Sequence, residues 1–346
     1  EFFAQGAISI LEGLGCIDTL CFGSECGELS VLQHIAQLLL SESDTYSHML
    51  QDALKKGYSF PVARHQALEK LTGDASVSQI LSEPNNILGI EYLKALKKQN
   101  SRMVPYTLKR DSSGYHDTKL QPQSSSASAI RNTLRHWEAQ PFGRYPADPQ
   151  QTPDGFSELL QNQLPENALR LLRDAWNQSC PIETNDFSLL LKYRLLCETR
   201  RSLCEYQDIS EDLANRIIRN RNQFLNFEQF CQLLKTKELT YSRISRGLLH
   251  ILLAVKKEDM LRYRESSCIY TRILGFRKEH ADVLRQIKEN ASIPVITKLG
   301  QTDSLLPETI RMLDQTTFAS DLYESVVSDK FGIPFINEYQ KQIIHV

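Results

Sequence analysis

Ser82-Glu83-Pro84-Asn85-Asn86-Ile87-Leu88-Gly89 opens a predicted helix with small polar side chains and a proline suited to a first turn. Further along the chain, Ser126-Ala127-Ser128-Ala129-Ile130-Arg131 opens a second helix in the same manner. Backbone N–H groups and the positive dipole end of such helix starts favour an anion. A strand-like stretch, 103–108, lies between them and ends at Lys109-Arg110. Together these features predict one wall of a nucleotide site.

The residues before this stretch predict an α/β unit. Apolar residues at helical spacing cover 2–14, and Gly15 follows as a C-cap. A short strand is expected over 17–22, ending in Gly23-Ser24-Glu25, and ligands collect at the carboxyl ends of such strands. Amphipathic helices are predicted over 29–40, 45–56, 61–71 and 86–98. With a helix first and only two clear strands, residues 1–140 resemble a parallel-sheet domain that lacks its first βαβ unit.

The residues after it predict a change of architecture. Four prolines punctuate 141–153, which we interpret as a linker. The pattern over 154–264 is helical, with helices expected at 155–163, 166–177, 185–199, 210–222, 226–236 and 240–257. The last part, 265–346, reverts to an α/β tail, with strands expected at 268–274 and 293–297 around a helix at 278–290. Two further segments are expected at 307–313 and 318–327.

Composition places few limits on function. A chain of 346 residues can form two or three domains, and 41% hydrophobic with 24% charged residues is typical of a globular protein. The formal net charge is -2, so any nucleic-acid surface must be a local patch. No run of eighteen apolar residues is present, so we expect no membrane partner, and the cysteine usage indicates a cytoplasmic location.

The cysteines and histidines do not predict a metal site. Cys16, Cys21 and Cys26 fall at five-residue intervals, whereas metal sites prefer tighter pairs such as C-x-x-C. We interpret the eight cysteines as structural thiols of a reducing compartment. The eight histidines are scattered, and His116 in a polar loop is either an acid–base group or a hydrogen-bonded loop residue.

Four features could contact a nucleotide, and each also has a structural explanation. Asn85 could read adenine or ribose edges, or simply cap a helix. Ser128 and Arg131 could clamp phosphate oxygens, or belong to a capped surface helix. Arg110 suits phosphate at a strand end, although a solvated strand end carries such residues too. Gly23 allows close backbone approach, but glycine also makes turns.

The helical region carries basic residues with tyrosines among them. Arg243, Arg246 and His250 share one face of a predicted helix because their spacing is i, i+3, i+7. Such a face suggests contact with an RNA backbone, while a solvated helix face is the alternative. The candidate RNA-binding residues are Arg216, Arg219, Lys235, Lys237, Arg243, Arg246 and His250.

These pieces, in this order, resemble one family. The matching stretches are Gly6-Ala7-Ile8-Ser9-Ile10-Leu11-Glu12, Leu20-Cys21-Phe22-Gly23-Ser24-Glu25, Pro84-Asn85-Asn86-Ile87-Leu88-Gly89, Pro105-Tyr106-Thr107 with Arg110, Tyr115-His116-Asp117, 126–131, Leu190 with Lys192-Tyr193-Arg194-Leu195-Leu196, and Leu234-Lys235-Thr236-Lys237. They are similar to the bacterial tRNA(Met) cytidine acetate ligases, a branch of the HxGH-type nucleotidyltransferase superfamily. The resemblance covers about residues 1–260.

The resemblance implies a ligase that activates acetate with ATP and acetylates the wobble cytidine of elongator tRNA(Met). It implies an incomplete nucleotidyltransferase-type Rossmann domain, then a mostly helical tRNA-binding domain and a small α/β tail. Gly23, Asn85 and Arg110 match positions that line the ATP site in the family. Ser128 and Arg131 fall at the superfamily's phosphate-binding helix start, and Mg²⁺ is expected with the ATP.

One departure from the family concerns catalysis. The family begins with a strand and a loop carrying an H-x-G-H-type motif, and no such motif occurs in this sequence. The catalytic residues are therefore unknown and expected in an N-terminal segment outside this sequence, and we expect this polypeptide alone not to adenylate acetate. Two alternatives stay open: a noncatalytic RNA-binding relative, and a nucleotidyltransferase with a small-molecule acceptor.

Overall fold

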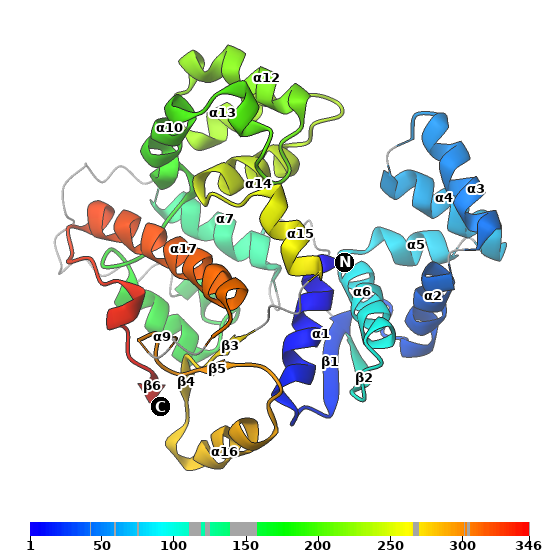
Figure 1. Cartoon of the computed structure of the whole chain (residues 1–346), viewed down its shortest axis with the longest axis horizontal. Coiled ribbons are helices and arrows are strands. Elements are labelled where there is room, and N and C mark those ends of the chain that lie inside the picture. The colour runs from blue at the N-terminus through cyan, green and yellow to red at the C-terminus, as the bar shows by residue number, and fades with distance from the viewer. Residues whose placement is uncertain are drawn as a thin grey trace. The chain divides into compact units, whose positions relative to one another are not determined.

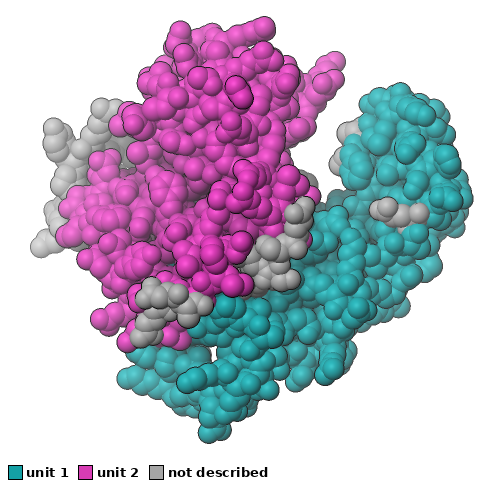
Figure 2. All heavy atoms as spheres, in the orientation of Figure 1, with its two compact units in different colours: residues 1–138, 269–295, 345–346 teal, residues 139–268, 296–344 magenta. Residues whose placement is uncertain are grey.

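The computed structural model describes residues 1–41, 43–58, 60–74, 76–110, 119–121, 125–138, 158–265, 270–300, 302 and 305–345 (Figure 1). Contacts group the chain into two compact units, coloured separately in Figure 2. Unit 1 consists of Glu1–Glu138, Ile269–Val295 and His345–Val346, and unit 2 of Ala139–Cys268 and Ile296–Ile344. Segments of the predicted tail thus fall in both units, and the four-part division at 140, 153 and 264 stays a prediction.

A two-stranded parallel sheet and the helices around it form the first part of unit 1. Strand β1 (Thr19–Ser24) pairs with β2 (Val104–Lys109), in a register that runs from Thr19 opposite Val104 to Ser24 opposite Lys109. This arrangement confirms the α/β prediction. The helices are α1 (Phe2–Leu14), α2 (Leu29–Ser41), α3 (Asp44–Lys55), α4 (Phe60–Thr72), α5 (Ser76–Ser82), α6 (Pro84–Lys98) and α7 (Ala127–Glu138).

Strand β1 begins and ends two residues later than the pattern of apolar residues indicates. Gly23 and Ser24 belong to the strand because they pair with Leu108 and Lys109. Ser24 is fully buried, and its hydroxyl lies 2.6 Å from that of Thr107 on the neighbouring strand. A hydroxyl pair across the ladder therefore extends the strand into residues that looked like its turn.

Two glycines determine how helices join this sheet. Gly15 ends α1 in the left-handed region, with φ 69°, and its N–H donates to the carbonyl of Glu12. Gly89 lies on α6, where a Cβ atom would come within 2.5 Å of the Phe22 ring. Glycine therefore allows α6 to approach β1 closely, next to a core in which Ile8 and Ile90 are fully buried.

The later segment of unit 1 contains only short strands. Strand β3 (Thr271–Arg272) pairs with β5 (Val295–Ile296), and β4 (Gly275–Phe276) pairs with β6 (Ile344–His345). The 3-10 helix η3 (Lys278–His280) leads into α16 (Ala281–Asn290), so the helix predicted over 278–290 is confirmed. The N–H of Ser292 donates to the carbonyl of Gly13 at 2.8 Å, which ties this segment to α1.

Unit 2 is helical, with a core that includes Leu191, Leu213, Phe227, Phe230 and Leu248. Side chains of Ser210, Asn226 and Thr240 cap three of its helices. Its elements are α9 (Glu166–Ala175), η1 (Thr184–Phe187), α10 (Ser188–Cys197), α11 (Arg200–Leu203), α12 (Glu211–Asn220), η2 (Arg221–Gln223), α13 (Phe227–Leu234), α14 (Tyr241–Leu252), α15 (Lys257–Glu265), α17 (Pro307–Phe331) and η4 (Glu338–Gln340).

Helix α17 is a single helix of 25 residues, where the sequence pattern indicates two segments, 307–313 and 318–327. Thr316 and Thr317 interrupt the apolar pattern between those segments. Their hydroxyls donate to the carbonyls of Met312 and Asp314, at 2.9 and 3.0 Å. Threonines that bond back to the preceding turn are accommodated within a helix, so the pattern breaks and the helix continues.

Two observations concern the membrane span and the cysteines considered in the sequence analysis. None of the described helices combines the length and the apolar character that crossing a bilayer requires. Cys231 is fully buried in the core of unit 2, and burial raises the pKa of its thiol to about 12. This thiol therefore packs as a small apolar group.

Candidate functional site: a pocket between α1, β1 and α6

A pocket of about 230 Å³ brings together three of the five residues predicted to bind nucleotide. Gly23 comes from β1, Asn85 from the first turn of α6, and Arg110 directly follows β2. The pocket thus includes the carboxyl end of β1, where ligands of parallel sheets bind. Its other lining residues are mostly apolar: Ala7, Leu11, Leu20, Cys21, Phe22, Leu88, Gly89 and Tyr92.

Gly23 and Arg110 are close neighbours in this pocket. The N–H of Arg110 donates to the carbonyl of Ser24 at 3.0 Å, which continues the parallel ladder by one residue. A Cβ atom on Gly23 would lie 3.4 Å from Cγ and 4.0 Å from Nη1 of Arg110. The missing side chain therefore leaves room for the arginine to lie over the strand end, where its guanidinium can meet an anionic ligand.

The first turn of α6 already holds an anion, and that anion is Glu25. Its carboxylate accepts from the N–H of Asn85 at 3.3 Å, the N–H of Asn86 at 2.8 Å and the Asn85 side-chain amide at 2.6 Å. The prediction of an anion at this helix start is therefore correct in its physics but wrong in its source. Phosphate is not needed to satisfy these donors, because a carboxylate of the chain does so.

Asn86, unlike Asn85, has a structural role. It is 1% exposed, its Oδ1 accepts from the N–H of Cys26 at 3.1 Å, and its Nδ2 donates to the carbonyl of Ile80 at 3.1 Å. Asn85, in contrast, is half-buried and lines the pocket. Neither asparagine side chain caps α6, so the capping interpretation of the pair is wrong and Glu25 replaces it.

Ser128 and Arg131 do not line the pocket. They lie on α7, where Arg131 Nη2 approaches the Ser128 hydroxyl at 3.5 Å and Ser126 caps the helix by accepting from the N–H of Ala129 at 3.0 Å. Their assignment to phosphate stays a prediction. His116 falls outside the described residues.

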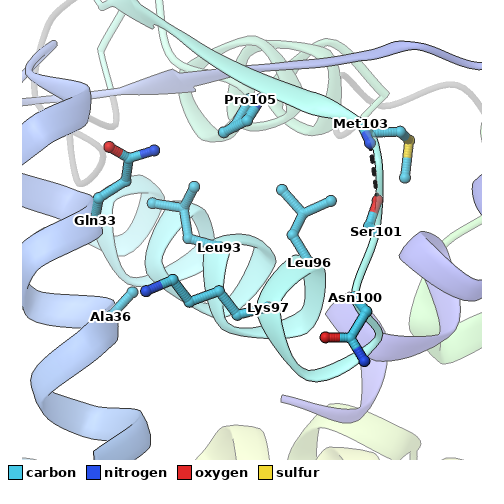
Figure 3. Close-up of a pocket in the computed structure, with 9 residues that line it drawn as sticks. All are labelled: Gln33, Ala36, Leu93, Leu96, Lys97, Asn100, Ser101, Met103 and Pro105. Atoms are coloured by element: carbon cyan, nitrogen blue, oxygen red, sulfur yellow. Dashed lines mark hydrogen bonds between the residues drawn. The ribbon is translucent and has the colours of Figure 1, made fainter.

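A larger pocket, of about 470 Å³, lies between α2, α6 and the start of β2 (Figure 3). Leu93 and Leu96 point into it, and two of its polar residues have partners within the protein. Lys97 donates to Gln37, and Ser101 Oγ accepts from the N–H of Met103 at 3.1 Å. Because it borders the amino end of β2 and holds none of the predicted site residues, we do not assign it to the ligand of the sheet.

In unit 2, three of the seven predicted RNA-binding residues bind other parts of the protein. Arg216 donates from Nε to the carbonyl of Leu234 at 3.0 Å. Arg246 forms an ion pair with Asp208 at 2.8 Å, and His250 lies 3.1 Å from the carbonyl of Gln207. The shared helix face is therefore real, but part of its charge is neutralised by the loop before α12.

The other four residues are exposed, and among the described residues none of their side chains has a hydrogen-bond or ion-pair partner. These are Arg219, Lys235, Lys237 and Arg243. Exposed cations of this kind can neutralise the phosphates of an RNA backbone. The described part of the chain also contains no group of three or more His, Cys, Asp or Glu side chains that could hold a metal ion.

Comparison with known proteins agrees with this geometry. Residues 1–333 match the model of the HIGH Nucleotidyl Transferase family. The chain is 36% identical over 324 residues to a tRNA(Met) cytidine acetate ligase from Caldanaerobacter subterraneus, covering 93% of this chain and 75% of that protein. A ligase of the same name from Clostridium acetobutylicum is 37% identical over 309 residues, covering 87% and 71%. The chain belongs to the HIGH Nucleotidyl Transferase family.

Two solved structures show the same fold. The crystal structure of apo Thermotoga maritima TmcAL matches with a TM-score of 0.85 and 26% identity, covering 99% of this chain and 80% of that one. A second structure of that protein, bound with alpha-thio ATP, matches with a TM-score of 0.83 and 25% identity, with the same coverage.

Two acidic residues of this family member were not singled out by sequence reasoning. Glu25 organises the start of α6, and Asp208 binds Arg246. Glu25 did have a signal, because it follows the strand-end glycine and serine directly. Asp208 had none, since its partner lies 38 residues away and no periodicity connects the two.

Proposed function

We propose that this protein activates acetate with ATP and transfers the acetyl group to N4 of the wobble cytidine of elongator tRNA(Met), forming N4-acetylcytidine. The observation that carries the proposal is the 36% identity, over 93% of the chain, to a protein named tRNA(Met) cytidine acetate ligase. The pocket that gathers Gly23, Asn85 and Arg110 supports it, because the family resemblance implies that these residues line the ATP site.

The reaction proceeds in two displacements. An acetate oxygen attacks the α-phosphorus of ATP, pyrophosphate leaves, and acetyl-adenylate forms. The N4 amine then attacks the acetyl carbonyl carbon, AMP leaves, and the amine loses a proton. Both steps need positioning and charge neutralisation around phosphates more than covalent help from the protein.

For ATP, the apolar lining of the pocket suits a base and ribose, and Arg110 at its edge suits a phosphate. The alpha-thio ATP bound to the structural neighbour TmcAL supports a nucleotide site in this fold. We assign Ser128 and Arg131 to a second phosphate contact. Mg²⁺ would be held chiefly by the triphosphate oxygens, as is usual for Mg²⁺ bound with a nucleotide.

For tRNA, we assign backbone contacts to the four exposed cations Arg219, Lys235, Lys237 and Arg243. Arg216, Arg246 and His250 would contribute after their present partners are released, or by holding the surface in place. In this proposal residues 1–140 bind ATP, 154–264 bind tRNA and 141–153 link the two. A reaction on tRNA also supports a cytoplasmic location.

The test is acetate-dependent ATP–pyrophosphate exchange, followed by transfer of labelled acetate to tRNA(Met). We expect both activities in the protein as its gene encodes it. Exchange that depends on another carboxylic acid or on an amine, and not on acetate, would indicate a different acceptor of the adenylyl group. Salt-sensitive tRNA binding without any exchange would indicate a noncatalytic relative and contradict the proposal.

A further inference from the structure

We propose that Glu25 is a positioning residue that turns the carbonyl oxygen of Asn85 toward the nucleotide and makes the pocket select adenine over guanine. The inference rests on the proposed ATP site. It adds a source of base specificity and a role for a residue that does not itself line the pocket.

The position of Glu25 is defined by rigid neighbours. Ser24, the preceding residue, is fully buried and bonded to Thr107 at 2.6 Å, and its hydroxyl also accepts from the N–H of Gly27 at 3.1 Å. The N–H of Cys26 donates to the buried Asn86 at 3.1 Å. The turn that carries Glu25 is therefore bound to both the sheet and α6.

The contact between Glu25 and Asn85 determines which way the carboxamide faces. A carboxylate only accepts hydrogen bonds, so the Asn85 atom that lies 2.6 Å from Glu25 Oε1 must be the amide nitrogen. The carbonyl oxygen then lies at the other end of the carboxamide, and among the described residues it has no hydrogen-bond partner. Without a partner of fixed polarity the two ends of an asparagine amide are interchangeable.

A free carbonyl oxygen distinguishes the two purines. Adenine carries an amino group, a donor, at the position where guanine carries a carbonyl oxygen, an acceptor. A base within the apolar lining of Phe22, Leu88 and Tyr92 could donate to Asn85 Oδ1 if it is adenine. Guanine would place two acceptors against each other, which is unfavourable.

The experiment measures the dissociation constants of ATP and GTP for the full-length wild-type protein and for Glu25→Gln. The glutamine amide carries a donor as well as an acceptor, so it no longer fixes the orientation of the Asn85 carboxamide, and either end of that carboxamide can face the pocket. We expect wild type to prefer ATP at least about tenfold, and Glu25→Gln to lower that preference about tenfold or more. Glu28→Gln is the matched control, because Glu28 is exposed and the charge change is the same.

A second variant separates positioning from helix capping. Asn85→Ser keeps the backbone N–H that Glu25 binds and removes the carbonyl oxygen, so it should abolish base preference. In Glu25→Gln/Asn85→Ser the preference should then equal that of Asn85→Ser alone, while the melting temperature reports any loss of the cap separately.

The outcomes distinguish this inference from the function it rests on. A wild-type protein that binds neither nucleotide would overturn both. ATP binding with an unchanged ATP-to-GTP ratio in Glu25→Gln, or in Asn85→Ser should Glu25→Gln fail to fold, would overturn the role of Glu25 and leave the ATP site standing.

Discussion

The pocket of unit 1 and the basic face of unit 2 were both anticipated from sequence, yet they were assembled in different ways. Gly23, Asn85 and Arg110 are far apart in the chain and meet in one pocket. The seven basic candidates lie within 216–250, and three of them bind the protein itself. Strand ends of a parallel sheet must meet, whereas a helix period determines which side chains share a face but not what they contact.

An acidic side chain determines what remains available in each region. Glu25 occupies the donors at the start of α6 and leaves only the carbonyl end of Asn85 for a ligand. Asp208 neutralises Arg246 and lies 3.6 Å from His250. The effects of substitutions on ligand affinity should therefore differ in size between the two regions. The larger loss of affinity is expected where a single residue meets a desolvated ligand.

The largest effect is expected for Arg110→Ala, measured as ATP affinity. A charged hydrogen bond to phosphate contributes about 1.5–3 kcal/mol, so the affinity should fall roughly 10–150-fold. Arg102→Ala is the matched control, since Arg102 is exposed, precedes the same strand, and its side chain has no partner among the described residues. Equal ATP affinity for Arg110→Ala and wild type would remove Arg110 from the site.

Gly89→Ala tests whether the close approach of α6 to β1 supports the pocket. The new Cβ would lie 2.5 Å from the Phe22 ring, so the helix or the ring must shift, at a cost of about 1–3 kcal/mol in unfolding free energy. Gly6→Ala on α1 is the control, because a Cβ there meets nothing within 4 Å and should stabilise the helix by about 0.5–1 kcal/mol. Urea unfolding measures both, and a stabilising Gly89→Ala would show that α6 has room.

Tyr206→Phe tests a buried polar contact in unit 2. The Tyr206 hydroxyl donates to Glu198 at 2.5 Å and accepts from Arg194 at 2.8 Å, so its removal should cost about 1–2 kcal/mol. Burial and Glu198 raise the pKa of Tyr206. The resulting stability is present below about pH 10, where an unfolded tyrosine ionises, and is lost as the pH rises through the folded pKa.

Urea unfolding at pH 8 and at pH 10.5 measures this difference. The wild type should lose more stability between the two pH values than Tyr206→Phe does. Tyr193→Phe is the control, because Tyr193 is 65% exposed and its hydroxyl has no partner among the described residues. An equal loss in wild type and Tyr206→Phe would show that this hydroxyl does not couple folding to pH.

The local spacing of apolar residues predicted most of the helices. The periods of α1 and α12 placed those helices within a few residues of their ends, with Gly15 as the cap of α1, whereas the helix expected to reach residue 257 ends at Leu252. The pattern missed α5, which has only 7 residues and little apolar surface. It also divided α17 at two threonines whose hydroxyls bond to the preceding turn.

Long-range partners limited what could be predicted about the sites. Gly23, Asn85 and Arg110 could be grouped from the sequence because the topology of a parallel sheet collects such residues, but the contact made by Glu25 lies 60 residues away in the chain. The roles of Arg216 and Arg246 depend on Leu234 and Asp208, at 18 and 38 residues. A charge pattern counts cations and does not show which of them a carbonyl or carboxylate already holds.

The smallest effects are expected on the basic face, where Arg243→Ala and Arg246→Ala should differ. Removing a side chain that binds one phosphate lowers the salt dependence of tRNA binding by about one unit of slope, and an exposed ion pair contributes about 1 kcal/mol or less. Arg243 should show both changes, whereas Arg246, held by Asp208, should show less. Asp208→Asn frees Arg246 and His250, so it should strengthen binding and steepen the slope. Titration of labelled tRNA(Met) at several salt concentrations measures all three, and a weaker affinity for Arg246→Ala than for Arg243→Ala would show that the ion pair opens on binding.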